Sequence, residues 1–189
     1  FIFEKFVYRN SFVSTSVSKL ENQKVKKLYN VKTHIFPNII NFSDKKKEKS
    51  EFNKKYILYS GSYEYQPNKK AIDRLYYDIM PKLNKKIPNM MLVLTGSKKI
   101  PFKANWLKNL GLVSKDRYIN TLRNSLCLIV PTREGYGTRV KIIEALCYGA
   151  VVVSSKIGIE GIRYNKKNPP PFECYDDHSF IKVICKLNK

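Results

Sequence analysis

Short apolar runs alternate with longer amphipathic stretches from residue 56 to the end of the chain. Runs such as LCLIV at 126–130 are typical of strands buried on both faces, and the stretches between them repeat apolar residues at helical spacing. The pattern predicts strands at 56–60, 90–95, 106–109, 126–130 and 150–154, and helices at 69–83, 115–124, 139–148 and 177–187. This alternation predicts an α/β fold, a Rossmann-like parallel sheet with helices on both faces.

Two polar residues stand where helix caps are expected. Asn68 precedes the predicted helix 69–83, and Ser114 precedes the predicted helix 115–124. Side-chain oxygens of Asn and Ser accept hydrogen bonds from the free N–H groups of a first helical turn. We therefore expect both residues to cap these helices.

The remainder of the chain divides into an N-terminal segment and a linker. Residues 1–42 hold a helix-like stretch followed by the extended sequence VKTHIFPNII, whereas residues 43–55 are charged and poor in apolar side chains. The latter composition is typical of an interdomain linker. We expect residues 56–189 to form the main domain, and the start without methionine suggests a piece of a longer protein.

The stretch PTREGYGTRVKIIEALCYG at 131–149 carries the clearest chemical signal. A predicted strand ends at its proline, a loop follows with Gly135 and Gly137, and the helical pattern begins near Thr138. Free backbone N–H groups and the positive end of the helix dipole favour an anion at such a place. A phosphate is the expected occupant.

The first turns of this helix carry charged residues. Arg139 has the planar fork that binds phosphate oxygens in pairs, and the carboxylate of Glu144 suits ribose hydroxyl groups. A simpler alternative is that Lys141 and Glu144, three residues apart, only pair with each other on the surface.

These residues resemble the donor-binding, C-terminal half of the GT-B glycosyltransferases. The family variant reads G-G-G-T-R-x-K-x-x-E-A-L-A-x-G, and residues 137–139, Lys141, 144–146 and Gly149 match it. Further stretches are similar to other family landmarks in the right order: 56–75, 90–97, 109–125 and 150–161, together with the closing helix. The similarity thus extends well beyond one glycine-rich motif.

The resemblance implies a glycosyltransferase of the hexosyl-transferring or a related class. It would bind a nucleoside-diphosphate sugar for transfer to a glycan or lipid-linked acceptor, and Arg139 and Lys141 would stabilise the leaving diphosphate as catalytic groups. The implied substrate-binding residues are Gly61, Ser62, Gly111, Leu112, Val113, Glu134, Gly135, Gly137, Thr138 and Glu144. Among them, 111–113 would contact the nucleobase, and Glu144 would bind the ribose.

The chain departs from the family pattern at two points. Longer motifs place two glutamates eight residues apart, whereas Glu134 and Glu144 are ten apart. Many members also carry an arginine and a lysine after the first strand to bind the phosphates, and residues 63–68 hold neither. That phosphate contact is either absent here or taken over by Arg139 and Lys141.

Two other classes of function remain open from the sequence. A GT-B-fold sugar-nucleotide epimerase would share this half of the fold, and a basic, non-catalytic binding module would need no ribose-binding glutamate. By this resemblance, residues 1–42 are a remnant of the N-terminal, acceptor-binding domain, and residues 56–189 are the C-terminal, nucleotide-sugar-binding domain. Acceptor groups in the resembling enzymes come largely from the N-terminal domain. We therefore expect this chain alone to bind a donor without transferring its sugar.

The formal net charge of +21 invites a nucleic-acid or membrane interpretation. Only seven of the 36 basic residues are arginine, the residue preferred by phosphate-reading proteins, so we do not expect a nucleic-acid partner. An anionic membrane surface is a possible further partner.

The cysteines and histidines narrow the remaining chemistry. The four cysteines form no C-x-x-C pair, which is typical of reduced thiols in a cytoplasmic protein, here with possible peripheral membrane contact. The two histidines have no metal partners at usable spacing, so we expect no metal and no cofactor beyond the donor substrate.

Overall fold

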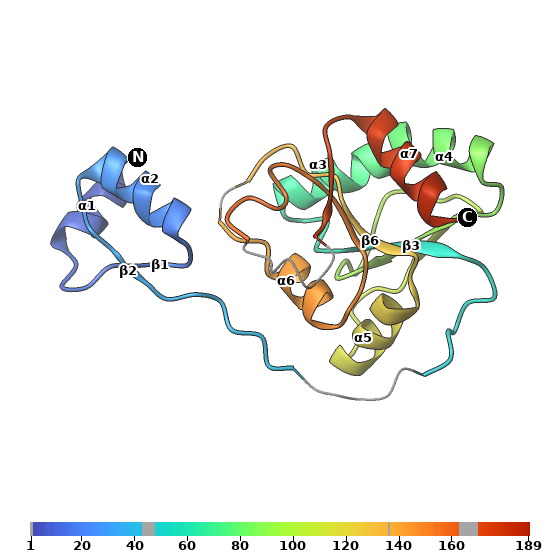
Figure 1. Cartoon of the computed structure of the whole chain (residues 1–189), viewed down its shortest axis with the longest axis horizontal. Coiled ribbons are helices and arrows are strands. Elements are labelled where there is room, and N and C mark those ends of the chain that lie inside the picture. The colour runs from blue at the N-terminus through green and yellow to red at the C-terminus, as the bar shows by residue number, and fades with distance from the viewer. Residues whose placement is uncertain (1, 43–47, 136, 163–169) are drawn as a thin grey trace.

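A computed structural model describes residues 2–42, 48–135, 137–162 and 170–189. Two parts of the chain are distinct in it: a small N-terminal unit and a larger sheet domain (Figure 1). Residues 43–47 of the predicted linker 43–55 lie outside the described residues. The proposed division at 42 and 56 therefore stays a prediction.

The sheet domain is built on six parallel strands. In spatial order these are β5 (Leu107–Asn109), β4 (Met91–Thr95), β3 (Tyr56–Ser60), β6 (Cys127–Val130), β7 (Val152–Ser155) and β8 (Phe172–Cys174). The chain runs outward from β3 to one edge, then returns to β6 beside β3 and runs outward to the other edge. This reversal between β3 and β6 is the topological switch point, where ligands of such sheets bind beyond the carboxyl ends of the strands.

Helices cover both faces of the sheet (Figure 1). One face carries α3 (Gln66–Arg74), the π-helical turn η1 (Leu75–Ile79), α4 (Met80–Lys86) and α7 (Asp177–Leu187). The other carries α5 (Lys115–Asn124) and α6 (Val140–Cys147). The predicted Rossmann-like fold with helices on both faces is confirmed.

Each face of the sheet has its own apolar core. Alternate residues of β3 point to opposite sides: Ile57 packs with α3, α4 and α7, whereas Leu58 packs with α5 and α6. Both side chains are completely buried. Burial on both faces explains why the strands read as continuous apolar runs.

Several element boundaries differ from the prediction. Helix α3 begins at Gln66, because Pro67 fits the first helical turn, so Asn68 lies inside the helix and does not cap it. Ser114 does cap α5, where its hydroxyl accepts from the Arg117 N–H. The short edge strand β8 was not predicted.

The N-terminal unit is a small β-α-β arrangement preceded by a helix. It comprises α1 (Ile2–Asn10), β1 (Thr15–Ser16), α2 (Lys19–Tyr29) and β2 (His34–Ile35), with β1 and β2 paired in parallel. Ser18 caps α2 by accepting from the Glu21 N–H. Among the described residues of this unit, Val25 and Tyr29 are the buried hydrophobic ones.

Candidate functional site

The loop after β6 is held at the switch point by a buried arginine of α3. Arg74 of α3 donates to the carbonyl of Pro131, at the start of the glycine loop, over 2.6 Å. The same guanidinium forms a 2.6 Å ion pair with Asp177 at the start of α7. Because Arg74 is only 6% exposed, these contacts fix the loop relative to two helices.

The turn after β3 is shaped by a close approach between Gly61 and Asn68. A Cβ atom at Gly61 would lie 2.7 Å from Asn68 Nδ2, so the turn requires glycine. Ser62 supports the turn, since its hydroxyl accepts from the Glu64 N–H. The sequence predicted both Gly61 and Ser62 as donor-binding residues, and of the two it is Gly61 that lies against the Asn68 side chain.

Lys141, in the first turn of α6, contacts Asn68 of α3 and Tyr59 of β3. Its Nζ donates to Asn68 Oδ1 over 3.1 Å and to the Tyr59 hydroxyl over 3.4 Å, and it lies 4.4 Å from the centroid of the Tyr59 ring. Burial, together with repulsion from Arg139, lowers the pKa of Lys141 to about 8. No carboxylate pairs with Lys141 among the described residues.

Glu144 lies one turn further along α6 and lines a cleft of about 370 Å³ together with Lys141. Its carboxylate is 3.6 Å from the ammonium of Lys115 on α5, and it does not pair with Lys141. The other lining residues are Ser60, Thr95, Gly96, Leu112, Val113, Lys115 and Tyr118. The cleft thus joins the ends of β3 and β4 to the first turns of α5 and α6.

Two hydroxyl groups beside this cleft lack a hydrogen-bond partner in the described structure: Thr95 Oγ1 and the Tyr118 hydroxyl. Burial and the nearby Glu144 carboxylate raise the pKa of Tyr118, so it is a neutral donor. Buried groups of this kind normally find a partner. They are suited to a polar ligand in the cleft.

Leu112 and Val113 of the predicted nucleobase-contacting segment 111–113 line the same cleft. The Gly111 N–H donates to Asn109 Oδ1, and the Gly111 carbonyl accepts from the Gly96 N–H, so both backbone groups of Gly111 are already paired. Leu112 and Val113 remain along the cleft wall, with Leu112 64% exposed.

The Arg139 side chain forms hydrogen bonds with its own loop. The guanidinium donates to the carbonyls of Gly137, Gly135 and Glu134 over 2.5, 2.9 and 3.2 Å. Desolvation lowers the pKa of Arg139. The side chain therefore stabilises the glycine loop. A phosphate could accept hydrogen bonds only from the guanidinium N–H groups that these carbonyls do not use. The Thr138 hydroxyl next to it is buried without a partner in the described structure.

Glu134 lies apart from the Glu144 cleft. Its carboxylate pairs with Lys70 over 2.6 Å, and with Gly135 it lines a second cleft of about 650 Å³. Tyr65, Pro67 and Arg133 form other parts of this wall. Glu134 and Glu144 therefore line different clefts.

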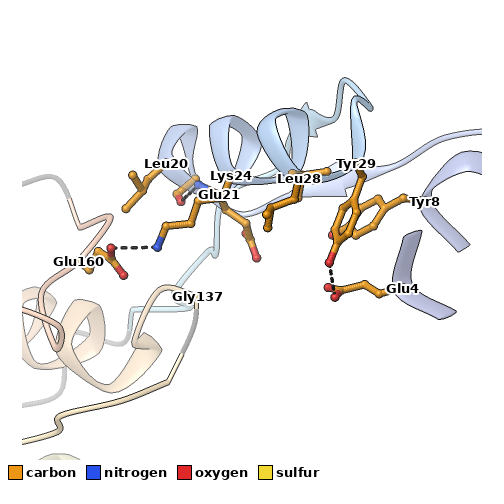
Figure 2. Close-up of a pocket in the computed structure, with 11 residues that line it drawn as sticks. Glu4, Tyr8, Leu20, Glu21, Lys24, Leu28, Tyr29, Gly137 and Glu160 are labelled. Carbon is orange, nitrogen blue, oxygen red and sulfur yellow. Dashed lines mark hydrogen bonds and ion pairs between the residues drawn. The ribbon is translucent and has the colours of Figure 1, made fainter. Parts of the chain in front are cut away.

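Gly137 lines a third cleft, of about 210 Å³, between the sheet domain and the N-terminal unit (Figure 2). Lys24 of α2 forms a 2.9 Å ion pair with Glu160 across it, and Tyr29 donates to Glu4 within the N-terminal unit. Leu20 and Leu28 supply part of the apolar lining.

The structure thus separates the predicted residues into groups. Lys141, Glu144, Leu112 and Val113 share one cleft, whereas Glu134 and Gly135 line another and Gly137 a third. Sequence reasoning missed Tyr59, Asn68, Lys115 and Tyr118 as parts of the site. Pro67 was the available signal for Asn68, because proline in a first turn moves the helix start forward.

Metal ligands and membrane spans were also sought in the ranges that the structure describes. No group of three or more His, Cys, Asp and Glu side chains in these ranges could hold a metal ion. None of the described helices combines the length and apolar character needed to cross a bilayer.

The order of the strands and the position of the cleft define an α/β nucleotide-binding fold of the GT-B type. The profile of the family "Glycosyl transferases group 1" matches residues 54–189. The chain belongs to this family. A search of curated proteins finds no match.

Solved structures share the fold. TarM aligns over 99% of this chain and 38% of its own length, with a TM-score of 0.71 and 13% identity. HepE from Anabaena, solved with UDP-glucose, aligns over 97% of this chain and 56% of its own, with a TM-score of 0.70 and 13% identity. An S. aureus TarM variant, solved with fondaparinux, α-GlcNAc-glycerol and UDP, aligns over 100% and 39%, with a TM-score of 0.69 and 16% identity. The chain therefore spans well under two thirds of these proteins.

Proposed function

We propose that this chain binds a nucleoside-diphosphate sugar and serves as the donor-binding part of a glycosyltransferase. The carrying observation is the ammonium of Lys141, which is half-buried at the switch point and has no carboxylate partner among the described residues. A cation in this position is suited to a diphosphate. The UDP and UDP-glucose bound in the related structures support UDP as the first nucleotide to test.

The proposed roles follow from the positions of the side chains. The nucleoside would occupy the cleft of Leu112, Val113 and Glu144, with the Glu144 carboxylate accepting from ribose hydroxyls. The diphosphate would lie between Lys141 and the free N–H groups at the start of α6, with Arg139 fixing the loop beside them.

Sugar transfer increases the negative charge on the departing diphosphate. A fixed cation and aligned N–H groups stabilise that charge without a proton transfer, because they are in place before the bond breaks. Lys141 would contribute the cation, and α6 would contribute the N–H groups and its dipole. We propose a glycan or lipid-linked molecule as the acceptor, in line with the α-GlcNAc-glycerol bound in one related structure.

Calorimetric titration with UDP, UDP-glucose and uridine tests the proposed site. We expect Glu144→Ala to weaken UDP binding by about 1–3 kcal/mol, the scale for losing hydrogen bonds to a charged group. Glu173→Ala, on the exposed surface of β8, is the matched control and should leave binding unchanged. Equal UDP affinity in Glu144→Ala and the parent chain would contradict the ribose role and favour a basic, non-catalytic module.

We further propose that the chain alone binds the donor without transferring sugar. The Glu144 cleft lies open, and productive transfer needs an acceptor held against the donor with water excluded. Incubation with UDP-glucose and a panel of glycan and lipid-linked acceptors should yield no product. Measurable transfer would show that the described residues supply the acceptor-positioning groups as well.

A further inference from the structure

We infer that Asn68 is a positioning residue that, with Tyr59, holds the Lys141 ammonium where the diphosphate of the donor would lie. The inference rests on the proposed function, because the diphosphate is the ligand that this ammonium would meet. It assigns a role to a residue that sequence analysis treats as a helix cap.

The geometry joins three elements at one amide oxygen. Asn68 Oδ1 on α3 accepts from the Tyr59 hydroxyl of β3 over 2.8 Å and from Lys141 Nζ of α6 over 3.1 Å. The ammonium also lies over the Tyr59 ring, 4.4 Å from its centroid. A flexible lysine side chain is thereby restricted by a hydrogen bond and a cation–π contact, which reduces the entropy lost when it binds a ligand.

The turn after β3 is matched to the Asn68 side chain. A Cβ atom at Gly61 would approach Asn68 Nδ2 to 2.7 Å and Cγ to 2.8 Å. Glycine at this position therefore makes room for the amide at the switch point. The amide is packed against the backbone that borders the candidate phosphate site, which is the arrangement expected of a supporting residue.

A neutral amide has a chemical advantage here. It orients the Lys141 ammonium without neutralising its charge, whereas a carboxylate at the same place would compete with the diphosphate. Burial and the neighbouring Arg139 lower the pKa of Lys141 to about 8. The other titratable groups that face the ammonium or share its cleft are Tyr59 on β3, Glu144 on α6, and Lys115 and Tyr118 on α5.

A double-mutant cycle tests whether Asn68 acts through Lys141. At pH 7.5 we expect Asn68→Ala to weaken UDP binding about tenfold, the scale of a hydrogen bond to a charged group, and to change uridine binding less than about twofold. Added to Lys141→Met, the same substitution should change UDP affinity less than about twofold, because its partner is already gone. Asn84→Ala on α4 is the matched control and should leave UDP affinity unchanged.

The pH profile of UDP binding supplies a second readout. UDP should raise the pKa of Lys141 above its free value of about 8, so UDP affinity is greatest below that pH and falls as the pH rises toward 9.5. Asn68→Asp keeps the size of the side chain but adds a carboxylate. We expect weaker UDP binding at pH 7.5 and a flatter profile between pH 7 and 9.5, since the new carboxylate already keeps Lys141 charged.

The outcomes separate this inference from the proposed function. If Asn68→Ala weakens UDP binding equally with and without Lys141, or if Asn68→Asp leaves the pH profile unchanged, the positioning role is wrong while nucleotide binding stands. If the parent chain binds none of UDP, GDP and ADP, the proposed function itself is overturned, and the inference with it. Thermal unfolding of each variant identifies any loss of binding that comes from misfolding.

Discussion

The N-terminal unit and the sheet domain differ in how far their apolar side chains are buried. In the sheet domain, Ile57, Leu58 and their neighbours on β4 and β6 are completely buried between two layers of helices. In the N-terminal unit, Ile2 and Phe12 are each more than 80% exposed. The sheet domain therefore has a core of its own, whereas the N-terminal unit gains little from burial among the described residues.

The contact between the two regions is correspondingly slight. Lys24 and Glu160 form a surface ion pair, with side chains 43% and 36% exposed. Exposed pairs of this kind contribute about 0–1 kcal/mol. We infer that stability and donor binding both belong mainly to the sheet domain.

The largest effect on stability is expected at Arg74. Arg74→Met removes the buried partner of Asp177 and the donor to the Pro131 carbonyl, which should lower the free energy of unfolding by about 3–5 kcal/mol. Chemical denaturation measures the loss. Arg117→Met is the matched control, because it removes an exposed ion pair with Glu51. It should lower the free energy of unfolding by about 0–1 kcal/mol. Equal costs would show that burial does not distinguish the two sites.

Arg139 tests how the glycine loop is held. Arg139→Lys keeps the charge but loses the guanidinium group that donates to the carbonyls of Gly135 and Gly137. The loop should then be less well fixed, and UDP binding should weaken by about 1–2 kcal/mol. Because the contacts are to protein, uridine binding should fall as well. A loss confined to UDP, with no change for uridine, would assign the side chain to the phosphates instead.

Substitutions in the N-terminal unit should have little effect on the stability of the sheet domain. Val25→Ala trims one of its buried side chains, and we expect the main unfolding transition, which reports the sheet domain, to shift by less than about 1 kcal/mol. Hydrogen exchange should show faster exchange in α2 alone. A shift of several kcal/mol would indicate that the two regions unfold together.

The smallest effect is expected at the contact between the regions. Lys24→Ala should change the free energy of unfolding by less than about 0.5 kcal/mol and leave UDP affinity unchanged, because the ion pair with Glu160 is exposed. Differential scanning calorimetry and a UDP titration measure the two quantities. A clear loss of UDP binding would extend the donor site to α2.

The sequence predicted most of the fold because buried strands and capped helices leave local signals. The apolar run 126–130 and the Ser114 cap are examples, each matched within a residue or two. The three-residue strand β8 is too short to show a period.

The site was harder to predict because its contacts are between elements. Asn68 meets Lys141 only when α3, β3 and α6 are packed together, and the acceptors of Arg139 are backbone carbonyls that any sequence carries. Arg74 gave no local signal either, since an arginine in a helix is usually at the surface. The motif around Glu144 located the candidate cleft, but its supporting residues needed the fold.

Titration of UDP into the whole chain and into residues 48–189 alone tests the central claim most directly. If the sheet domain holds the donor site, both should bind UDP with dissociation constants between about micromolar and millimolar, equal within about twofold. Binding by the whole chain that is lost in residues 48–189, while the shorter chain still unfolds cooperatively, would contradict the assignment of the donor site to the sheet domain.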